Sequence, residues 1–437
     1  MAEAQCDTHT TTMTARIACS EQATPRLQGS APRMLTKKSF WSAGHRPTLF
    51  AALLYFDLAF MVWVLLGPLA PQIAQDLGLS PAEKGLMVAV PTLAGAILRL
   101  FVGLAVDRFG PKMTGSIAQL IVIVGLLTAW KVGIDSFAGT LALGLLLGVA
   151  GASFAVALPL ASRWYPPEHQ GKALGIAGMG NSGTVFAALF APTIAVLFGW
   201  NAVLGLATVP LALAFAFYLL MARDAPDRPR RRPLAAYLEP LRTRDAWLFM
   251  LFYGVTFGGF SGLAASLSIY FTDRFGLSAV TAGYCTAACV FAGSLVRPLG
   301  GALADRHGGI RTLSIVYAVA AAALVIVSRD PATIAAALGL FVVAMLAFGI
   351  GNGAVFQLVP QRFREELGAM TGLVGMAGGV GGFYLASSLG FARQATGSYQ
   401  SGFLIFAALA LAALAALTCV KRRWRTRWEL AAEGVRI

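Results

Sequence analysis

Two arginines stand inside apolar stretches of this chain, where a permanent positive charge is costly. Arg99 lies in "GAILRLFVGLAVDR" (Gly95–Arg108), and Arg297 lies 198 residues later in an apolar run of its own. Arg99 precedes Asp107 by eight residues, which places it about 12 Å along a helix from that charged end. An arginine at the centre of a membrane helix costs about 2.5–3.5 kcal/mol on insertion scales. The pair therefore calls for a compensating negative charge.

The chemistry that two such arginines offer is the binding of an oxyanion. A guanidinium group is planar, stays charged, and donates two parallel hydrogen bonds to a planar or bidentate oxyanion. The alternative is that each arginine snorkels or pairs with a carboxylate, but snorkelling is difficult from the middle of a helix. Asp57 is the only carboxylate that we place inside an apolar span. One carboxylate does not neutralise two arginines, so we expect an anionic ligand between Arg99 and Arg297.

The elements that must position these arginines are membrane-spanning helices. Of the 437 residues, 57% are hydrophobic and 12% are charged, whereas soluble domains carry about 25% charged residues. Apolar runs of about 20 residues match the thickness of the hydrocarbon core, and they predict an all-α membrane protein with twelve transmembrane helices. The expected spans are 48–70, 84–105, 112–132, 137–161, 171–192, 199–221, 246–271, 279–302, 312–328, 332–358, 368–391 and 400–420.

The distribution of basic residues predicts the orientation of these spans. With the N-terminus in the cytosol, 27 of the 34 lysines and arginines fall on the cytosolic side, five fall on the opposite side, and two are the arginines inside the membrane. Basic residues in short loops remain cytosolic. We therefore expect both termini in the cytosol and a multi-pass protein of the cell (inner) membrane. The net charge of +14 then reflects topology and interaction with the lipid bilayer, and does not indicate nucleic-acid binding.

The chain also contains an internal repeat. A shift of 198 residues places the stretch 95–110 on 293–308 with six identities, and it superimposes Arg99 on Arg297. A repeat of six helices is typical of parallel-repeat transporters. It predicts two pseudo-symmetric six-helix halves. The expected domains are a polar tail at 1–47, a first half at 48–222, a cytosolic linker at 223–245, a second half at 246–420 and a basic tail at 421–437.

The stretch "GLAVDRFGPK" (Gly103–Lys112) resembles the loop signature of the major facilitator superfamily, and "GALADRHGGIR" (Gly301–Arg311) resembles its copy in the second half. The resemblance implies the major facilitator fold and a role for these loops in conformational change. The aspartates are expected to pair with basic residues or to cap a helix N-terminus. The residues concerned are Asp107, Arg108, Asp305 and Arg306.

Two glycine-rich helices carry a narrower resemblance. The stretches "GKALGIAGMGNSGTVF" (Gly171–Phe186) and "GAMTGLVGMAGGVGGFY" (Gly368–Tyr384) resemble the signatures of the nitrate/nitrite porter family within that superfamily, and the stretches 53–91 and 349–360 agree. Close packing of membrane helices explains part of this glycine content. The resemblance implies that the glycines also let these helices slide past their neighbours. The glycines singled out are Gly175, Gly178, Gly180, Gly183, Gly372, Gly375, Gly378 and Gly379.

The same resemblance assigns roles around the paired arginines. It implies that Arg99 and Arg297 clamp nitrate or nitrite, and that the amide of Asn181 donates a hydrogen bond to the anion. It also implies that aromatic residues wall the site, although core packing explains aromatic residues equally well. These aromatic residues are Phe154, Tyr253 and Phe257, and two weaker candidates for the pathway are Asn352 and Gln357.

The mode of coupling stays open at the level of sequence. Asp57 is a site of proton coupling, a partner for Arg99, or a structural acceptor in the first helix. Proton-coupled uptake, nitrate/nitrite exchange and nitrite export use the same binding chemistry, and the family resemblance favours uptake. The alternative substrate is a small organic anion such as formate or oxalate, which two arginines would also hold.

Other function classes lack support in the residues. The four histidines lie in tails or loops, and no metal, cofactor or nucleotide signature is present, so we expect a transporter and no enzyme. Cys285 and Cys289 are too few for a zinc site. We expect a monomer without a cofactor.

Overall fold

The computed structural model describes residues 39–226, 234–363 and 366–428, and all regular elements in this part are helical. Twelve segments are long and apolar enough to cross a membrane, which confirms the twelve expected spans. Most of the polar and basic tails, and part of the linker, lie outside the described residues. The helices are α1 (Phe40–Ala43), α2 (Arg46–Trp63), α3 (Leu66–Leu77), α4 (Pro81–Phe109), α5 (Pro111–Val132), α6 (Phe137–Gly151), α7 (Phe154–Ser162), α8 (Pro167–Gly178), η1 (Met179–Ser182), α9 (Gly183–Phe198), α10 (Trp200–Met221), α11 (Leu234–Leu238), η2 (Glu239–Arg242), α12 (Arg244–Phe275), α13 (Ala279–Leu295), α14 (Arg297–His307), α15 (Gly309–Val327), α16 (Ile334–Arg362), α17 (Leu367–Thr396) and α18 (Gln400–Trp428).

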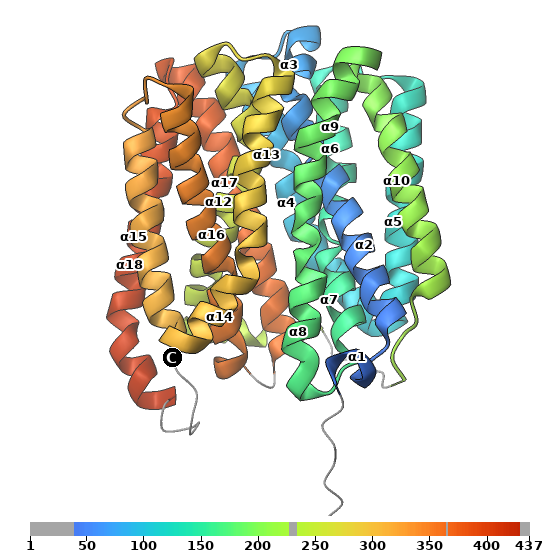
Figure 1. The fold of residues 1–437 in the computed structure, drawn as a ribbon, viewed down its shortest axis with the longest axis vertical. Coiled ribbons are helices and arrows are strands. Elements are labelled where there is room, and N and C mark those ends of the chain that lie inside the picture. The colour runs from blue at the N-terminus through green and yellow to red at the C-terminus, as the bar shows by residue number, and fades with distance from the viewer. Residues whose placement is uncertain (1–38, 227–233, 364–365, 429–437) are drawn as a thin grey trace, which may run out of the picture. The chain divides into compact units, whose positions relative to one another are not determined.

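Successive spans run in opposite directions, so their ends gather at two faces (Figure 1). We call the face that holds the start of α2 and the end of α18 the terminal face, and the opposite one the distal face. The end of α3 and the start of α4 lie at the distal face, whereas α14 ends at the terminal face (Figure 1).

Four spans are interrupted near their middles, which the apolar pattern alone did not predict. The first span breaks between α2 and α3, the fourth between α6 and α7, the fifth at the 3₁₀ turn η1, and the eighth at Val296, between α13 and α14. Proline follows Arg297 directly and cannot donate a backbone hydrogen bond, which accounts for the last break. Such breaks place backbone groups and side chains at mid-depth where ligands bind in membrane transporters.

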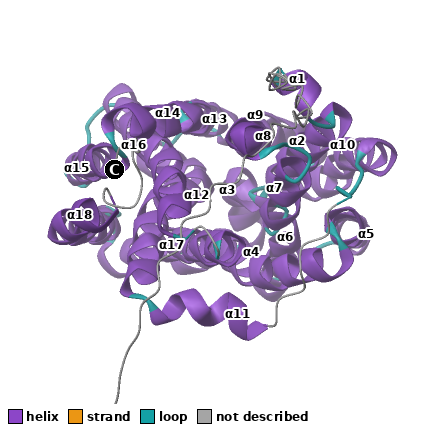
Figure 2. Cartoon of the chain, turned by 90° about the horizontal axis from the view of Figure 1, so that it is seen from below, coloured by secondary structure: helices purple, strands orange, loops and turns teal. Residues whose placement is uncertain are grey.

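Glycine brings the first six spans (α2 to α10) and the last six (α12 to α18) together near the distal face. Helices α4 and α17 lie side by side (Figure 2), and a Cβ atom added to Gly85 would lie 2.8 Å from the Cα of Gly390. Helices α9 and α13 meet in the same way, because a Cβ at Gly283 would lie 2.6 Å from the carbonyl oxygen of Ala188. Close approach of this kind needs small residues on both helices.

The terminal part of the same helices is packed differently. A Cβ atom added to Gly175, Gly178 or Gly372 would meet no atom of a described residue within 4 Å. These positions lie in α8 and α17, towards the terminal face from the close contacts described above. The contrast indicates that the structure is closed at the distal side and open beside the terminal parts of α8 and α17.

Candidate anion-binding site

Arg99 lies on α4 and is held by backbone carbonyl groups of two other helices. Its side chain is buried, with 2% of the residue exposed. Nε and Nη2 donate to the carbonyl oxygen of Gly151 at 3.2 and 3.1 Å, and Nη1 donates to the carbonyl oxygen of Gly375 at 2.6 Å. Gly151 ends α6 at the break in the fourth span, and Gly375 belongs to α17 among the last six spans. Arg99 therefore bridges the two sets of spans at mid-depth.

Three aromatic rings surround the same guanidinium group. Its central carbon lies 5.3 Å from the ring centroid of Phe154, 5.4 Å from that of Phe257 and 5.7 Å from that of Trp63. These distances are within the range of cation–π attraction, which partly offsets the loss of hydration. Trp63 is fixed in place because its indole N–H donates to the carbonyl oxygen of Pro91 at 2.7 Å.

Arg297 lies at the start of α14 and faces the same aromatic residue. Its guanidinium carbon is 6.0 Å from the ring centroid of Phe154 and 5.8 Å from that of Phe356. Nη2 donates to the hydroxyl of Tyr253 at 3.3 Å. Nη1 is buried and has no hydrogen-bond partner among the described residues. The structure thus brings the two arginines to one ring, Phe154, and leaves buried donor capacity on Arg297.

Neither arginine forms an ion pair within the described part of the chain. The basic partners of its five ion pairs are Lys84, Arg163, Arg274, Arg362 and Arg423. Asp57 is 7% exposed and accepts a hydrogen bond from Ser182 Oγ at 2.7 Å. It lies against the break in the fifth span, since a Cβ added to Gly183 would overlap the carbonyl oxygen of Asp57. The position of Asp57 is therefore that of an acceptor at the interface between α2 and η1.

Asn181 and Asn352 are buried amides with an unpaired atom. Their exposed fractions are 2% and 1%, and the side-chain oxygen of each has no partner among the described residues. Asn181 lies in η1, next to the hydrogen bond between Ser182 and Asp57. Among the described residues, neither amide side chain hydrogen-bonds to Arg99 or Arg297. Buried amides without partners are costly, so both sites have capacity for a ligand.

The aromatic residues expected around the site lie together. Tyr253 is stacked on Phe257 at 5.2 Å between centroids and meets Phe356 edge-on at 4.9 Å. A Cβ added to Gly378 would lie 2.7 Å from the Tyr253 ring, so this glycine lets α17 lie against the pair. At Gly375 a Cβ would stay 3.6 Å or more from its neighbours, which are Arg99 and Phe154.

The other glycines of the two signatures divide into packed and open positions. A Cβ at Gly180 would meet the ring of Phe56 at 2.4 Å, and one at Gly379 would meet Ala96 Cβ at 2.6 Å. Both glycines therefore allow close contact between helices. The open positions in α8 and α17 have no such packing reason in this structure.

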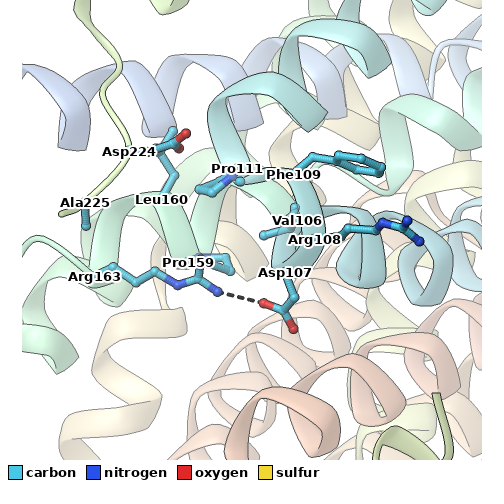
Figure 3. Close-up of a pocket in the computed structure, with 11 residues that line it drawn as sticks. Val106, Asp107, Arg108, Phe109, Pro111, Pro159, Leu160, Arg163, Asp224 and Ala225 are labelled. Carbon is cyan, nitrogen blue, oxygen red and sulfur yellow. Dashed lines mark hydrogen bonds and ion pairs between the residues drawn. The ribbon is translucent and has the colours of Figure 1, made fainter. Parts of the chain in front are cut away.

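The loop residues at the terminal face form a separate cluster around a pocket (Figure 3). Asp107 forms an ion pair with Arg163 at 2.9 Å, and Asp224 accepts from the backbone N–H of Lys112 at the start of α5 at 2.9 Å. In the second copy, Asp305 is exposed and forms no ion pair with a described residue. The repeat in sequence therefore does not give a repeat in these contacts.

The guanidinium of Arg108 lies 5.5 Å from the ring of the adjacent Phe109. Arg306 occupies the matching exposed position near the end of α14. Both arginines belong to loops at the terminal face and lie outside the cluster around Arg99.

Sequence reasoning missed several groups of this site. The carbonyl groups of Gly151 and Gly375 carry no signal in the residue type. Trp63 and Phe356 lie in stretches that resemble the porter family, and this is the signal that could have found them.

The twelve helices, the repeat and the polar residues at mid-depth define a transporter of the major facilitator class. The family model described as Major Facilitator Superfamily matches residues 51–386. A bacterial homologue of the human lysosomal transporter Spinster, in an inward-facing and occupied conformation, is similar with a TM-score of 0.64, 19% identity, and coverage of 86% of this chain and 96% of that one. The human organic anion transporter MFSD10 gives a TM-score of 0.66 at 14% identity and covers 85% and 99%. These likenesses confirm the fold.

Closer relatives define the branch. The chain is 34% identical to "Nitrite extrusion protein" of Bacillus subtilis, over 81% of this chain and 89% of that protein. It is 34% identical to "Probable nitrate/nitrite transporter NarK2" of Mycobacterium tuberculosis, over 81% and 91%, and 31% identical to "Probable nitrate/nitrite antiporter NarK1" of Thermus thermophilus, over 83% and 88%. The chain belongs to the nitrate/nitrite porter family of the major facilitator superfamily. It is a multi-pass membrane protein, and the family and the fold are those of transporters, not enzymes.

Proposed function

We propose that the protein carries nitrate or nitrite across the cell membrane by alternating access, with the anion held between Arg99 and Arg297. The observation that carries this proposal is that both guanidinium groups lie within 6.0 Å of the Phe154 ring centroid, and that Arg297 keeps a buried Nη1 without a partner among the described residues. The names of the relatives in bacteria support the choice of anion. A planar oxyanion matches the geometry of guanidinium donors.

The balance of charge supports a bound anion. Neither arginine is neutralised by a carboxylate within the described residues, and Asp57 is engaged with Ser182. An uncompensated charge at mid-depth is expensive. A bound anion with delocalised charge compensates the positive charge of both arginines. Because the compensation ends when the anion dissociates, the binding is reversible, as a carrier requires.

Several further residues are assigned to the site. Tyr253 positions Arg297 through its hydroxyl, and Phe154 and Phe257 exclude water around the guanidinium groups. Asn181 supplies an amide donor from η1 once its side-chain amide turns, because the unpaired atom is the acceptor oxygen and the NH₂ group must face the anion. The glycines of α8 and α17 permit these helices to approach their neighbours when the terminal side closes.

The proposed topology follows the basic residues. The terminal face is cytosolic, and the protein lies in the cell (inner) membrane as a monomer. Residues 48–222 and 246–420 form two halves that rock about the site, joined by the linker 223–245. The close contacts at the distal side and the open space beside α8 and α17 then correspond to an inward-facing state.

Coupling to protons or to nitrite exchange completes the cycle, with uptake of nitrate as the favoured direction. Asp57 is the candidate for a proton site, since it is a buried carboxylate beside η1 and intramembrane carboxylates often carry protons. Uptake by the Asp57→Asn variant should lose its dependence on a pH gradient. Unchanged pH dependence would leave exchange as the mode of coupling.

The decisive experiment is competition in proteoliposomes that contain the purified protein. Uptake of labelled nitrate should be inhibited by nitrite and chlorate, and much less by formate or oxalate. Competition by formate without competition by nitrite would assign the site to organic anions.

Arg297→Lys should lose most transport, because lysine keeps the charge and lacks the planar pair of donors. Arg329→Lys, at an exposed position of the distal face, is the matched control and should transport normally.

A further inference from the structure

One ion pair joins the two sets of spans at the distal face. Lys84, near the start of α4, lies with its Nζ 3.3 Å from Oδ1 and 3.4 Å from Oδ2 of Asp273, near the end of α12. Of the five ion pairs between described residues, the other four each join residues within one set of six spans. Both side chains are 20% exposed, so the pair is shielded and still reached by water.

Two further hydrogen bonds belong to the same cluster. The hydroxyl of Tyr399, in the loop between α17 and α18, donates to Oδ2 of Asp273 at 2.9 Å. Burial and the neighbouring Asp273 raise the pKa of the Tyr399 hydroxyl above its usual range, so this group remains a donor at neutral pH. The backbone N–H of Ala82 donates across to the side-chain oxygen of Gln394 at 3.1 Å.

The start of α4 is built to hold Lys84 in this position. Ser80 and Glu83 form a capping box, in which the Ser80 hydroxyl accepts from the Glu83 N–H and the Glu83 carboxylate accepts from the Ser80 N–H. Such a box fixes the first turn of a helix. One turn further, Gly85 contacts Gly390 of α17. The ion pair therefore lies at the end of the α4–α17 contact that closes the distal side.

We propose that the Lys84–Asp273–Tyr399 cluster is a latch that holds the distal side closed and sets the balance between the two access states. The proposal rests on the alternating-access cycle proposed above. An interaction shifts a conformational equilibrium only by the difference in its energy between the states. The latch is formed across a contact that must separate when the distal side opens, so its energy is present in one state and absent in the other.

The energy of the latch suits a gate that opens during each cycle. A largely exposed ion pair contributes little, and partial shielding with a third hydrogen-bonding group increases the contribution. When the distal side opens, water solvates both charges. The opening is therefore reversible without an additional ion or ligand.

The test measures the populations of the two states without any substrate. Spin labels at Asp135 and Ala332 report separation at the distal face, and labels at Lys172 and Arg311 report closure at the terminal face; all four positions are exposed. The five native cysteines are replaced before labelling. The distances between the spin labels are measured by pulsed electron paramagnetic resonance spectroscopy on the protein in lipid nanodiscs.

Lys84→Gln and Asp273→Asn should each raise the ratio of distal-open to distal-closed protein about fivefold or more, as expected for the loss of about 1 kcal/mol. Tyr399→Phe should produce a smaller change in the same direction. The exchanged pair Lys84→Asp with Asp273→Lys should restore a substantial part of the closed population. Folding of each variant is checked in two ways. Its distal-closed fraction should keep the wild-type distance distribution between the terminal-face labels, and the purified protein should be monodisperse.

The matched control is Asp330→Asn, which removes the ion pair of Asp330 with Arg274 at the same face but within the last six spans. It should leave both distance distributions unchanged. Equal distributions for the wild type and Lys84→Gln would overturn the latch, and so would an equal shift in the Asp330→Asn control. Because nitrate is absent from this assay, either result is independent of whether nitrate is the substrate.

Discussion

Replacement by lysine should affect Arg99 and Arg297 differently, although the two residues occupy equivalent positions in the repeat. Arg99 donates three hydrogen bonds to the carbonyl groups of Gly151 and Gly375. Arg297 donates one, to Tyr253. A lysine ammonium group is compact, and it cannot reach two carbonyl groups that belong to different helices and accept from different edges of the guanidinium group.

The magnitudes follow from these bonds. A buried carbonyl group that loses its partner costs about 1–3 kcal/mol, so Arg99→Lys should lower the free energy of unfolding by about 2–4 kcal/mol once weaker contacts with the aromatic rings are included. At 3.3 Å the bond from Arg297 to Tyr253 is long, and its loss should cost less than about 1 kcal/mol. If both arginines bind the anion as proposed, each variant should lose a bidentate contact, which corresponds to about 10–150-fold in Kd.

Thermal unfolding of the purified protein, with and without nitrate, measures both effects, because a ligand of the folded state raises the unfolding midpoint. Arg297→Lys should unfold near the wild-type midpoint and lose the rise that nitrate produces. Arg99→Lys should unfold several degrees lower and lose that rise as well. The surface variant Arg329→Lys should match the wild type in both respects. Equal midpoints for the two site variants, or a nitrate-dependent rise that survives in either, would refute the reasoning.

Three further substitutions test packing and charge. Gly378→Ala should lower stability by about 1–3 kcal/mol through overpacking, because its Cβ would lie 2.7 Å from the Tyr253 ring; an unchanged unfolding midpoint would contradict this. Asp245→Asn should cost about 1–2 kcal/mol, since the Asp245 side chain is 10% exposed but its partner Arg362 at 2.7 Å is 35% exposed and stays hydrated, and the loss should appear in thermal unfolding and not in Kd for nitrate. Trp63→Phe removes the 2.7 Å hydrogen bond to a backbone carbonyl and should lower nitrate affinity a few-fold by loosening the rings around the site, measured by the nitrate-dependent rise in midpoint.

The spans and the paired arginines were predictable from sequence because the bilayer imposes strong rules. A helix must supply about 20 apolar residues and satisfy its own backbone, and an arginine that violates the first rule is conspicuous. The repeat then identified Arg297 from Arg99 without any structural knowledge. Tyr253 and Phe257 came from family resemblance. The two rings stack because they lie four residues apart on α12, and Tyr253 also accepts a hydrogen bond from Arg297.

The groups that hold the arginines were not predictable. The carbonyl of Gly151 becomes an acceptor because the fourth span breaks after it, and a backbone carbonyl is present at every residue. The partnership of Lys84 with Asp273 joins residues 189 positions apart in sequence, and it depends on how the two sets of spans dock. The partner of Asp57 was not predictable either. The sequence did not show whether this carboxylate pairs with an arginine or accepts a hydrogen bond from Ser182, as it does in the structure.

Arg99 and Arg297 differ in their hydrogen-bond partners in this structure, and this difference leads to a prediction for the other access state. In the distal-closed structure Arg99 donates to the carbonyl of Gly375. The matching residue Gly178, 197 positions earlier, is a position where an added Cβ would have no described neighbour within 4 Å. If the halves exchange roles when they rock, Arg297 should donate to the carbonyl of Gly178 in the distal-open state and Arg99 should lose its bond to Gly375. Each arginine would then be held by the opposite half in turn, and the anion would compete with a backbone carbonyl for one arginine in each state. A distal-open structure, for which the latch variants are suited, tests this directly, and an Arg99–Gly375 bond that persists there would show that Arg99 is a fixed strut and that the repeat is not used symmetrically.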